Sequence, residues 1–465
     1  MNLQGQEKIY LWKIFPPLKV KATYSEIWGI AYPIILASLA QTIVNVTDSA
    51  FLARVGEAEM GAASIGGVFY FLMIMLGLAI SIGAQILISR KAGEGNKSQI
   101  GQIFNHSFIL LSAFGFILFM VAYFFAPLIY SHIIVSPEVA SASSLFIKYR
   151  SFGLLFSLPV LALRAFYIGI SNTKIITYQG IILAVVNITL GYILIFGHFG
   201  FEPMGVKGAA IASAMAEIIS SLFIVVYTFF YPKIKEFNLF RIKNFVWSEC
   251  KNILLISSPI LFQNFISMAS WFLFFVMIEK IGQHELAISN VIRTCYTIMM
   301  MCTWGFSSAA NSMVSNLIGQ GKEHEIFGLI KKIVILSFTI NGLLIFIYML
   351  FPYLLLDLVG SDEKIVADSL VSFYIVCVAT LILSISVVLL SAVSGTGKTK
   401  AAMRIEIVNI VLYLGYIYVF TIIYKSSVET VWLSEIIYWF SMGVFSFIYL
   451  KSRKWVENEL PQPSL

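Results

Sequence analysis

The sequence predicts an all-α polytopic membrane protein with twelve transmembrane helices in two pseudo-symmetric lobes of six helices each. Three observations predict this class: the composition, a series of long apolar segments and an internal repeat. Of the 465 residues, 59% are hydrophobic and 12% are charged, and the mean hydropathy is +0.88. A soluble domain carries about 25% charged residues. So much apolar surface cannot be covered within a water-soluble globule, so the solvent must be lipid.

Apolar segments long enough to cross a bilayer, about 20 residues each, recur from end to end. We expect helices, because an isolated span must satisfy its own backbone hydrogen bonds. The short alternating segments typical of a β-barrel do not occur in the sequence. The expected spans are 25–52, 60–89, 101–131, 143–169, 175–198, 205–231, 248–278, 285–316, 327–357, 368–394, 401–424 and 430–451.

The second half of the chain repeats the first at a nearly constant offset. Pro33 falls on Pro259 and Tyr70 on Tyr296, although near Gly191 the match suggests an offset smaller by two. Six spans per unit would keep both halves in the same orientation, an arrangement of transporters with the substrate site between halves. The predicted units are an N-terminal segment 1–24, an N-lobe 25–231, a linker 232–247, a C-lobe 248–451 and a C-terminal tail 452–465.

The distribution of basic residues predicts the orientation. If the N-terminus is cytoplasmic, 22 of the 31 Lys and Arg residues lie in inside segments, 7 lie in outside segments and 2 lie within spans. This bias follows the positive-inside rule and predicts a multi-pass protein of the inner (plasma) membrane with both termini in the cytoplasm. The net charge of +7 then reflects cytoplasmic loops, and we expect no nucleic-acid partner.

The stretch "SAVSGTGKTKA" at 391–401 looks like a nucleotide-binding loop. A P-loop would need its first glycine at the position of Ala392, between a strand and a helix. Residues 395–400, "GTGKTK", repeat "GISNTK" at 169–174. We therefore expect a structural turn between two helices, in which glycine adopts an unusual dihedral, and no nucleotide. The four cysteines and five histidines show no metal-binding spacing, so no cofactor or metal is expected.

Several motifs together resemble the prokaryotic branch of the MATE (multidrug and toxic compound extrusion) family, in the MOP flippase superfamily. The motifs are "PIILASLAQTIVNVTDSAFLARVGEAEMGAAS", "QILISRKAGEGN", "NITLGYILIFGHFGFEPMGVKGAAIAS" and "SNLIGQGK". The resemblance covers essentially all twelve spans. It implies a V-shaped pair of lobes and an ion-coupled antiporter, not an enzyme. Such a protein, expected as a monomer, exports drug-like, often cationic small molecules in exchange for H+ or Na+.

Asp48 is the strongest candidate for the coupling site, because ionisable groups within spans are functional hypotheses by default. Gln41, Asn45 and Asp48 are spaced i, i+4, i+7 and share one helix face, which should face a cavity or a partner helix. The resemblance places the N-lobe proton or cation site at Asp48. A carboxylate among apolar neighbours could exchange protons near neutral pH. The alternative is a polar cluster that only packs helices.

The resemblance also selects Asn187 as a neighbour of Asp48. Many members carry a second acid where this chain has Gly191, which leaves Asp48 to work with amides and hydroxyls. Ser213 is a candidate neighbour, or alternatively a small residue that allows close helix packing. Pro33 within the first span removes a helical hydrogen bond, and the resemblance implies that bending there reshapes the N-lobe.

In the second half, Asp48 maps to Phe274, and the span 7 glutamate of some family branches is missing. We therefore expect coupling in the N-lobe alone. Aromatic side chains of the C-lobe are candidates for contact with an organic cation, or for core packing. The candidates for the substrate cavity are Phe262, Trp271, Tyr296 and Arg293.

Arg293 lies deep in span 8 and could pair with an acid such as Glu435 or meet an anionic partner. Glu217, Glu406 and Glu435 are secondary acid candidates for a cation pathway, although Glu406 sits near a helix end and looks structural. A lipid or polysaccharide-precursor flippase of the same superfamily is the alternative function. The drug antiporter is favoured because the candidate interior residues are mainly acidic, with Arg293 as the only deep basic residue.

Overall fold

The computed structural model describes residues 18–241, 245–359 and 363–456, so the predicted tails lie largely outside the described residues. Within the described part the chain is helical throughout, with no strand. The first half forms α1 (Tyr24–Ala53), α2 (Glu57–Glu94), α3 (Lys97–Met120), α4 (Ala126–Ile133), α5 (Pro137–Arg150), α6 (Leu154–Gly169), α7 (Lys174–Phe196) and α8 (Gly205–Phe230).

The second half repeats this order. It forms α9 (Trp247–Glu279), α10 (Gln283–Gly319), α11 (Ile326–Leu350), α12 (Tyr353–Val359), α13 (Glu363–Asp368), α14 (Leu370–Gly395), α15 (Thr399–Tyr418) and α16 (Val428–Lys451). A π-helical segment, Val121–Phe125, joins α3 to α4, and a short 3-10 helix, Ser151–Gly153, joins α5 to α6, so that each pair forms a single span. Twelve helical segments of the described chain are therefore long and apolar enough to cross a membrane, which confirms the predicted fold class.

Most helix ends lie within a few residues of the predicted spans. The clearest difference is the ninth span, expected to reach residue 357, whose helix α11 ends at Leu350. Pro352 follows two residues later. Proline disfavours helical backbone at the residue before it and cannot continue the hydrogen-bond ladder. The apolar residues after it form the separate short helix α12.

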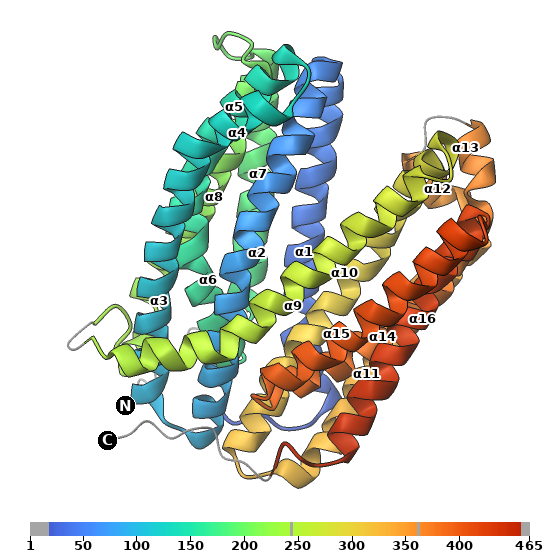
Figure 1. Ribbon diagram of the computed structural model, residues 1–465. Helices are drawn as coiled ribbons and strands as arrows, with labels where there is room; N and C mark the ends of the chain where they lie inside the picture. The colour runs from blue at the N-terminus through green and yellow to red at the C-terminus, as the bar shows by residue number, and fades with distance from the viewer. Residues whose placement is uncertain (1–17, 242–244, 360–362, 457–465) are drawn as a thin grey trace, which may run out of the picture.

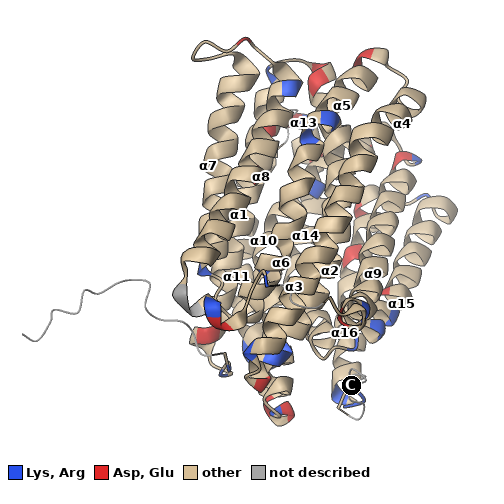
Figure 2. Cartoon of the chain, turned by 90° about the vertical axis from the view of Figure 1, so that its left-hand side faces the viewer, with Lys and Arg blue, Asp and Glu red and all other residues tan. Residues whose placement is uncertain are grey.

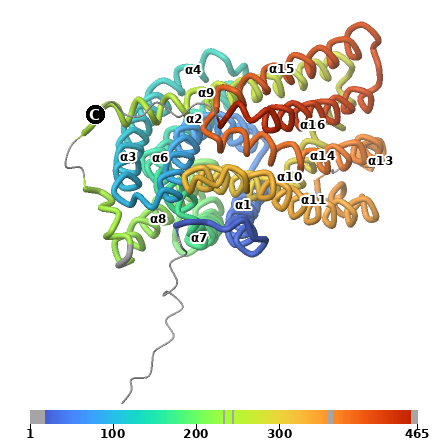
Figure 3. The backbone as a smooth tube through the Cα atoms, turned by 90° about the horizontal axis from the view of Figure 1, so that it is seen from below, coloured from blue at the N-terminus to red at the C-terminus, as the bar shows by residue number. Residues whose placement is uncertain are grey.

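The helices form two bundles, α1–α8 and α9–α16, which we call the N-lobe and the C-lobe. Figure 1 shows that the bundles meet at one end, where α2 and α10 finish, and diverge toward the other, in the predicted V shape. We call these the closed end and the open end. Viewed from the closed end, α1 lies beside α10 of the other lobe (Figure 3). Charged residues gather near the helix ends, leaving most of the middle uncharged (Figure 2).

Small residues allow the two lobes to touch at the closed end. Ser89 of α2 and Ser312 of α10 share a hydrogen bond of 2.8 Å between their Oγ atoms. A side chain at Gly93 would collide with the backbone of Asn316, and one at Gly319 would collide with the backbone of Arg90. Gly93 and Gly319 are repeat-related positions, so the internal symmetry of the sequence produces a symmetric contact between lobes.

The described part of the predicted linker, up to Arg241, lies against α3. Asn105 of α3 donates from Nδ2 to the carbonyl oxygens of Asn238 and Arg241, each at 3.2 Å. Its Oδ1 accepts from the backbone N–H of Phe240 at 2.7 Å. These three hydrogen bonds help to hold the path from α8 to α9 against the N-lobe, together with the Lys97–Glu236 ion pair. The exact unit boundaries remain predictions.

Candidate functional site

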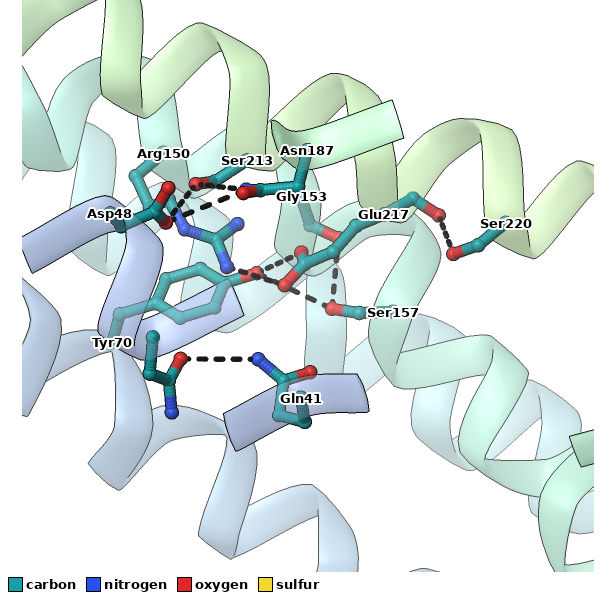
Figure 4. A network of polar contacts seen from close by, with 11 residues as sticks. Gln41, Asp48, Tyr70, Arg150, Gly153, Ser157, Asn187, Ser213, Glu217 and Ser220 are labelled. Carbon is teal, nitrogen blue, oxygen red and sulfur yellow. Dashed lines mark hydrogen bonds and ion pairs between the residues drawn. The ribbon is translucent and has the colours of Figure 1, made fainter. Parts of the chain in front are cut away.

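Three helices of the N-lobe bring Asp48, Asn187 and Ser213 together, as the sequence predicted (Figure 4). They lie on α1, α7 and α8 respectively. Ser213 Oγ donates to Asp48 Oδ2 at 3.2 Å, and Asn187 Nδ2 approaches the same oxygen at 3.5 Å. Asn187 also donates to Ser213 Oγ at 2.9 Å. Both neighbours are almost fully buried.

Two oxygens of this cluster are left without partners. Asp48 Oδ1 and Asn187 Oδ1 are enclosed and accept no hydrogen bond from the described residues. A buried oxygen with no donor costs free energy, on the order of 1–3 kcal/mol. A proton or a small cation at either acceptor atom would offset that cost.

A second part of the network was missed by the sequence analysis. Arg150 was counted as an outside residue, but it ends α5 inside the N-lobe, with its side chain 13% exposed. Its Nη2 donates to Glu217 Oε1 at 2.5 Å, and its guanidinium carbon lies 3.8 Å from the centre of the Tyr70 ring. Tyr70 also donates its hydroxyl to Glu217. A buried acid whose partner lies on another span could only be found in three dimensions.

Arg150 also connects Glu217 to the Asp48 cluster. Its charge acts on Asp48 across the interior of the lobe, and its Nη1 has no hydrogen-bond partner among the described residues. Gly153 allows this approach, since a side chain there would collide with Glu217, Arg150 and Tyr70. Glu217 is thus neutralised by a permanent cation, whereas Asp48 has no such ion pair within the described part.

The predicted polar stripe on α1 divides in the structure. Gln41 donates to Asn45 Oδ1 at 3.3 Å, and both side chains are exposed. Neither one bonds to Asp48, whose partners come from α7 and α8 instead. The helix spacing places all three on one face, but it does not fix how far along that face the partner helices reach.

Pro33 lies inside α1, and its missing N–H would leave the carbonyl of Gly29 without its helical donor. Thr173, at the start of α7, donates its hydroxyl to that carbonyl at 3.2 Å. Thr177 donates to the carbonyl of Pro33 itself at 3.0 Å. The proline is thus stabilised by α7, the helix that also carries Asn187.

In the C-lobe, two aromatic residues stand where the N-lobe has the polar pair Asp48 and Asn187. Phe274 and Tyr413 occupy the positions of the repeat that correspond to Asp48 and Asn187, and their rings stack with centroids 6.0 Å apart. This correspondence uses the offset of 226 that also pairs Pro33 with Pro259. The restriction of coupling to the N-lobe stays a prediction.

Among the predicted cavity residues, Phe262 is 48% exposed and Tyr296 is 1% exposed. Tyr296 donates to Glu435 Oε2 at 3.0 Å, so this tyrosine belongs to the interior of the lobe and does not face a cavity in this conformation. Trp271 is half-buried beside Phe275, at 5.7 Å between centroids. Of the two alternatives for Arg293, the pair with Glu435 does not form among the described residues, and the guanidinium carbon lies 5.3 Å from the centre of the Phe275 ring.

The stretch 391–401 contains the end of α14, a short turn and the start of α15. Gly397 has φ of +84°, and the repeat-related Ser171 has φ of +59°. The left-handed residue is thus present in both copies, but glycine provides it only in the second. Arg90 of α2 donates to the carbonyl of Thr396 at 2.8 Å, which ties the turn to the other lobe. Helix rather than strand precedes the turn, so the context of a P-loop is missing.

The MatE family profile matches residues 33–193 and 259–419, together more than half of the chain. The chain belongs to the MatE family. Its two matched segments are the two halves of the internal repeat, in the same register that pairs Pro33 with Pro259. The family comprises MATE transporters and not enzymes, so this chain is a multi-pass membrane transporter.

Curated relatives and solved structures agree with this family. The chain is 26% identical over 398 residues to a probable multidrug resistance protein NorM of Thermotoga maritima, covering 85% of each chain. It is 27% identical to a NorM protein of Agrobacterium fabrum, over 62% of each chain. A multidrug resistance MATE family transporter in an outward-facing conformation superposes with a TM-score of 0.86 and 17% identity, covering 95% of this chain and 98% of that one. A MOP superfamily transporter from Pyrococcus furiosus superposes with a TM-score of 0.86 and 17% identity, covering 94% of this chain and 96% of that one.

Proposed function

We propose that this protein is a secondary active antiporter that exports amphipathic, often cationic organic compounds in exchange for H+ or Na+. The observation that carries the proposal is the Asp48 cluster. One carboxylate oxygen is held by Asn187 and Ser213 and the other is enclosed without a donor. This arrangement fits a site that is occupied by a small cation in one state of the cycle and vacated in another.

The two lobes support alternating access. They touch at the closed end and diverge at the open end, and the contact between α2 and α10 depends on small residues. Loading and release of an ion at Asp48 would bias the packing of α1 against α7, because Asn187 of α7 contacts Asp48. The same helix and its N-cap also supply Thr177 and Thr173, whose hydroxyls donate to α1 carbonyls around Pro33. We infer an inner or plasma membrane location with cytoplasmic termini from the distribution of basic residues.

The test is dye export by the purified protein in liposomes, with imposed pH or Na+ gradients and ethidium as the organic-cation probe. Wild-type protein should move ethidium only when a gradient is present. Asp48→Asn should abolish gradient-driven movement while the protein still folds. The matched control is Asp357→Asn, because Asp357 is exposed on α12 and should keep wild-type rates. Unchanged export by Asp48→Asn would refute the coupling role.

A fluorescent phospholipid and a polyprenyl-linked sugar are used as further probes in the same liposomes. Movement of either probe without any ethidium transport would replace the antiporter with the flippase alternative. Ethidium transport with neither lipid probe moved supports the antiporter.

A further inference from the structure

The outer surface of the C-lobe has an open groove between α15 and α16, near the closed end. Its volume is about 410 Å³. Viewed from the closed end, α15 lies at an outer edge of the C-lobe, away from α1 (Figure 3). Val408 of α15 and Ile448 of α16 line the groove, and they are 49% and 58% exposed. Apolar side chains that stay exposed on a span belong in the lipid, whose tails are equally apolar. The groove therefore opens toward the bilayer.

The end of the groove that lies toward the closed end is polar. Arg404 lies in the second turn of α15 and Lys454 follows the end of α16, and both side chains line the groove and are exposed. Tyr449, near the end of α16, lines the groove as well, and the charge of Arg404 acts on its hydroxyl. The rest of the wall includes Ile405 and Phe445. An apolar groove thus ends in two cations and a phenolic hydroxyl.

The chain reverses directly after α16 and so holds the backbone of Lys454 in place. Arg453 has a left-handed backbone with φ of +53°, and its N–H donates to the carbonyl of Leu450 at 3.3 Å. Trp455 is 5% exposed, and its indole N–H donates to the same carbonyl at 2.9 Å. Because a buried tryptophan follows Lys454 directly, less conformational freedom is lost when this lysine binds a ligand.

Neither cation of the groove forms an ion pair with an acid of the described residues. Glu406 is only two positions after Arg404, but it is buried inside the C-lobe. Its carboxylate accepts from the hydroxyls of Ser267 on α9 and Tyr438 on α16. Arg404 and Lys454 are therefore available to an anion from the surroundings.

The surroundings of the groove favour such an anion. Further exposed basic residues lie at the same end of the C-lobe (Figure 2): Lys400, Lys451 and Arg453. A concentration of one sign of charge raises the local concentration of the opposite ion. In the first half of the chain, the position that corresponds to Arg404 is Tyr178. The cation is therefore present in one copy only, and the turn that both copies share does not require it.

We propose that this groove binds a phospholipid with an anionic headgroup, taken from the leaflet at the closed end. The phosphate pairs with Arg404 and Lys454, and an acyl chain lies along Val408 and Ile448. A guanidinium can donate two parallel hydrogen bonds to a phosphate, and basic pockets between spans suit anionic lipid headgroups. A free phosphate would meet the same cations but would leave the apolar walls uncovered. The site lies outside the Asp48 cluster and does not depend on the proposed antiport.

The experiment measures the binding of phosphatidylglycerol to the purified full-length protein in a neutral detergent, counted by native mass spectrometry over a range of lipid concentrations. The first variant combines Arg404→Gln with Lys454→Gln. Near an anionic lipid each basic residue contributes about fivefold in affinity, so the affinity should fall by about 25-fold. The matched control combines Lys451→Gln with Arg453→Gln, at exposed positions outside the groove. It removes the same charge and should stay close to wild type.

A second pair of variants tests the apolar walls without changing the charge. Val408→Trp fills the groove, whereas Val411→Trp places the same side chain at a 65% exposed position of α15 outside it. Both positions are exposed on the surface, so the core is left unchanged. Phosphatidylglycerol binding should be lost in Val408→Trp and kept in Val411→Trp.

Three results would overturn the inference. Equal losses in the groove variant and its charge control would reduce the effect to general attraction at a basic surface. Equal binding of zwitterionic phosphatidylcholine by the wild type would remove the role of the two cations. Competition by inorganic phosphate, together with unchanged binding in Val408→Trp, would assign Arg404 and Lys454 to a free anion instead of a lipid.

Discussion

Asn316 of α10 donates its Nδ2 amide to the carbonyl oxygen of Leu18, at 2.8 Å, and so ties the start of the described chain to the opposite lobe. Its Oδ1 accepts from the backbone N–H of Val20 at 3.2 Å. Gln320 donates to the carbonyl of Val20 at 2.9 Å. The segment 18–22, which leads into α1, is thus a strap across the closed end, and it joins the first helix of the N-lobe to α10 of the C-lobe.

The strap should restrain opening of the closed end. Asn316→Ala removes one donor and one acceptor and leaves buried backbone groups unpaired, at a cost of about 1–3 kcal/mol. Hydrogen exchange at Val20 should accelerate by about tenfold for each 1.4 kcal/mol lost. Asn290→Ala, an exposed position on the same helix, is the control. Equal exchange rates in the two variants would show that the strap contributes no restraint.

Close contact between the lobes should depend on Gly93. Gly93→Ala places a methyl group against the backbone of Asn316, and overpacking of this kind costs about 1–3 kcal/mol. A spin-label pair across the closed end should report a longer distance in this variant. Gly67→Ala on the same helix has nothing within 4 Å of the added carbon and should leave the distance unchanged. A wild-type distance in Gly93→Ala would contradict the role of this contact.

The Arg150–Glu217 pair should be costly to break on one side only. Arg150→Met leaves Glu217 buried without a cation, and such changes cost about 3–5 kcal/mol. Arg150→Met combined with Glu217→Gln should recover part of that loss, because the uncompensated charge is removed. The measurement is thermal unfolding of the purified variants in one detergent. Additive effects of the two substitutions would mean that the pair is not coupled.

The interaction of Thr173 with Gly29 should matter only because of Pro33. Thr173→Val leaves the Gly29 carbonyl without a donor and should reduce the free energy of unfolding by about 1 kcal/mol. Pro33→Ala restores a helical N–H for that carbonyl, so Thr173→Val should cost less in a Pro33→Ala background. Thermal unfolding of the four proteins forms a double-mutant cycle. An equal cost in both backgrounds would assign the threonine another role.

The orientation can be tested by labelling single cysteines in a cysteine-free variant. Lys235→Cys and Lys400→Cys lie at exposed positions that the charge distribution places in the cytoplasm. A membrane-impermeant thiol reagent should label both only after the membrane is opened. Glu202→Cys, in an outside segment, should be labelled in intact cells. Labelling of Lys235→Cys from outside would invert the topology.

The sequence by itself determined the membrane class, the number of spans, the repeat and the candidate Asp48. These properties follow from composition, segment length and the i, i+4, i+7 spacing, which are local and periodic. The position of Asn187 beside Asp48 was also predicted, through the resemblance to the family. The same reasoning kept Gln41 and Asn45 in the cluster, because periodicity gives a face of a helix but not the neighbours along it.

Only the tertiary structure decided which acids have partners. Arg150 and Glu217 are separated by a long stretch of chain, and nothing local in the sequence indicates that α5 and α8 place them 2.5 Å apart. Glu406 has one carboxylate oxygen without a hydrogen-bond donor among the described residues, whereas both oxygens of Glu435 accept hydrogen bonds. The sequence shows each of them only as a glutamate within an apolar span, so it does not reveal this difference. The physical reason is that the state of a buried charge depends on donors from other helices, which packing alone brings together.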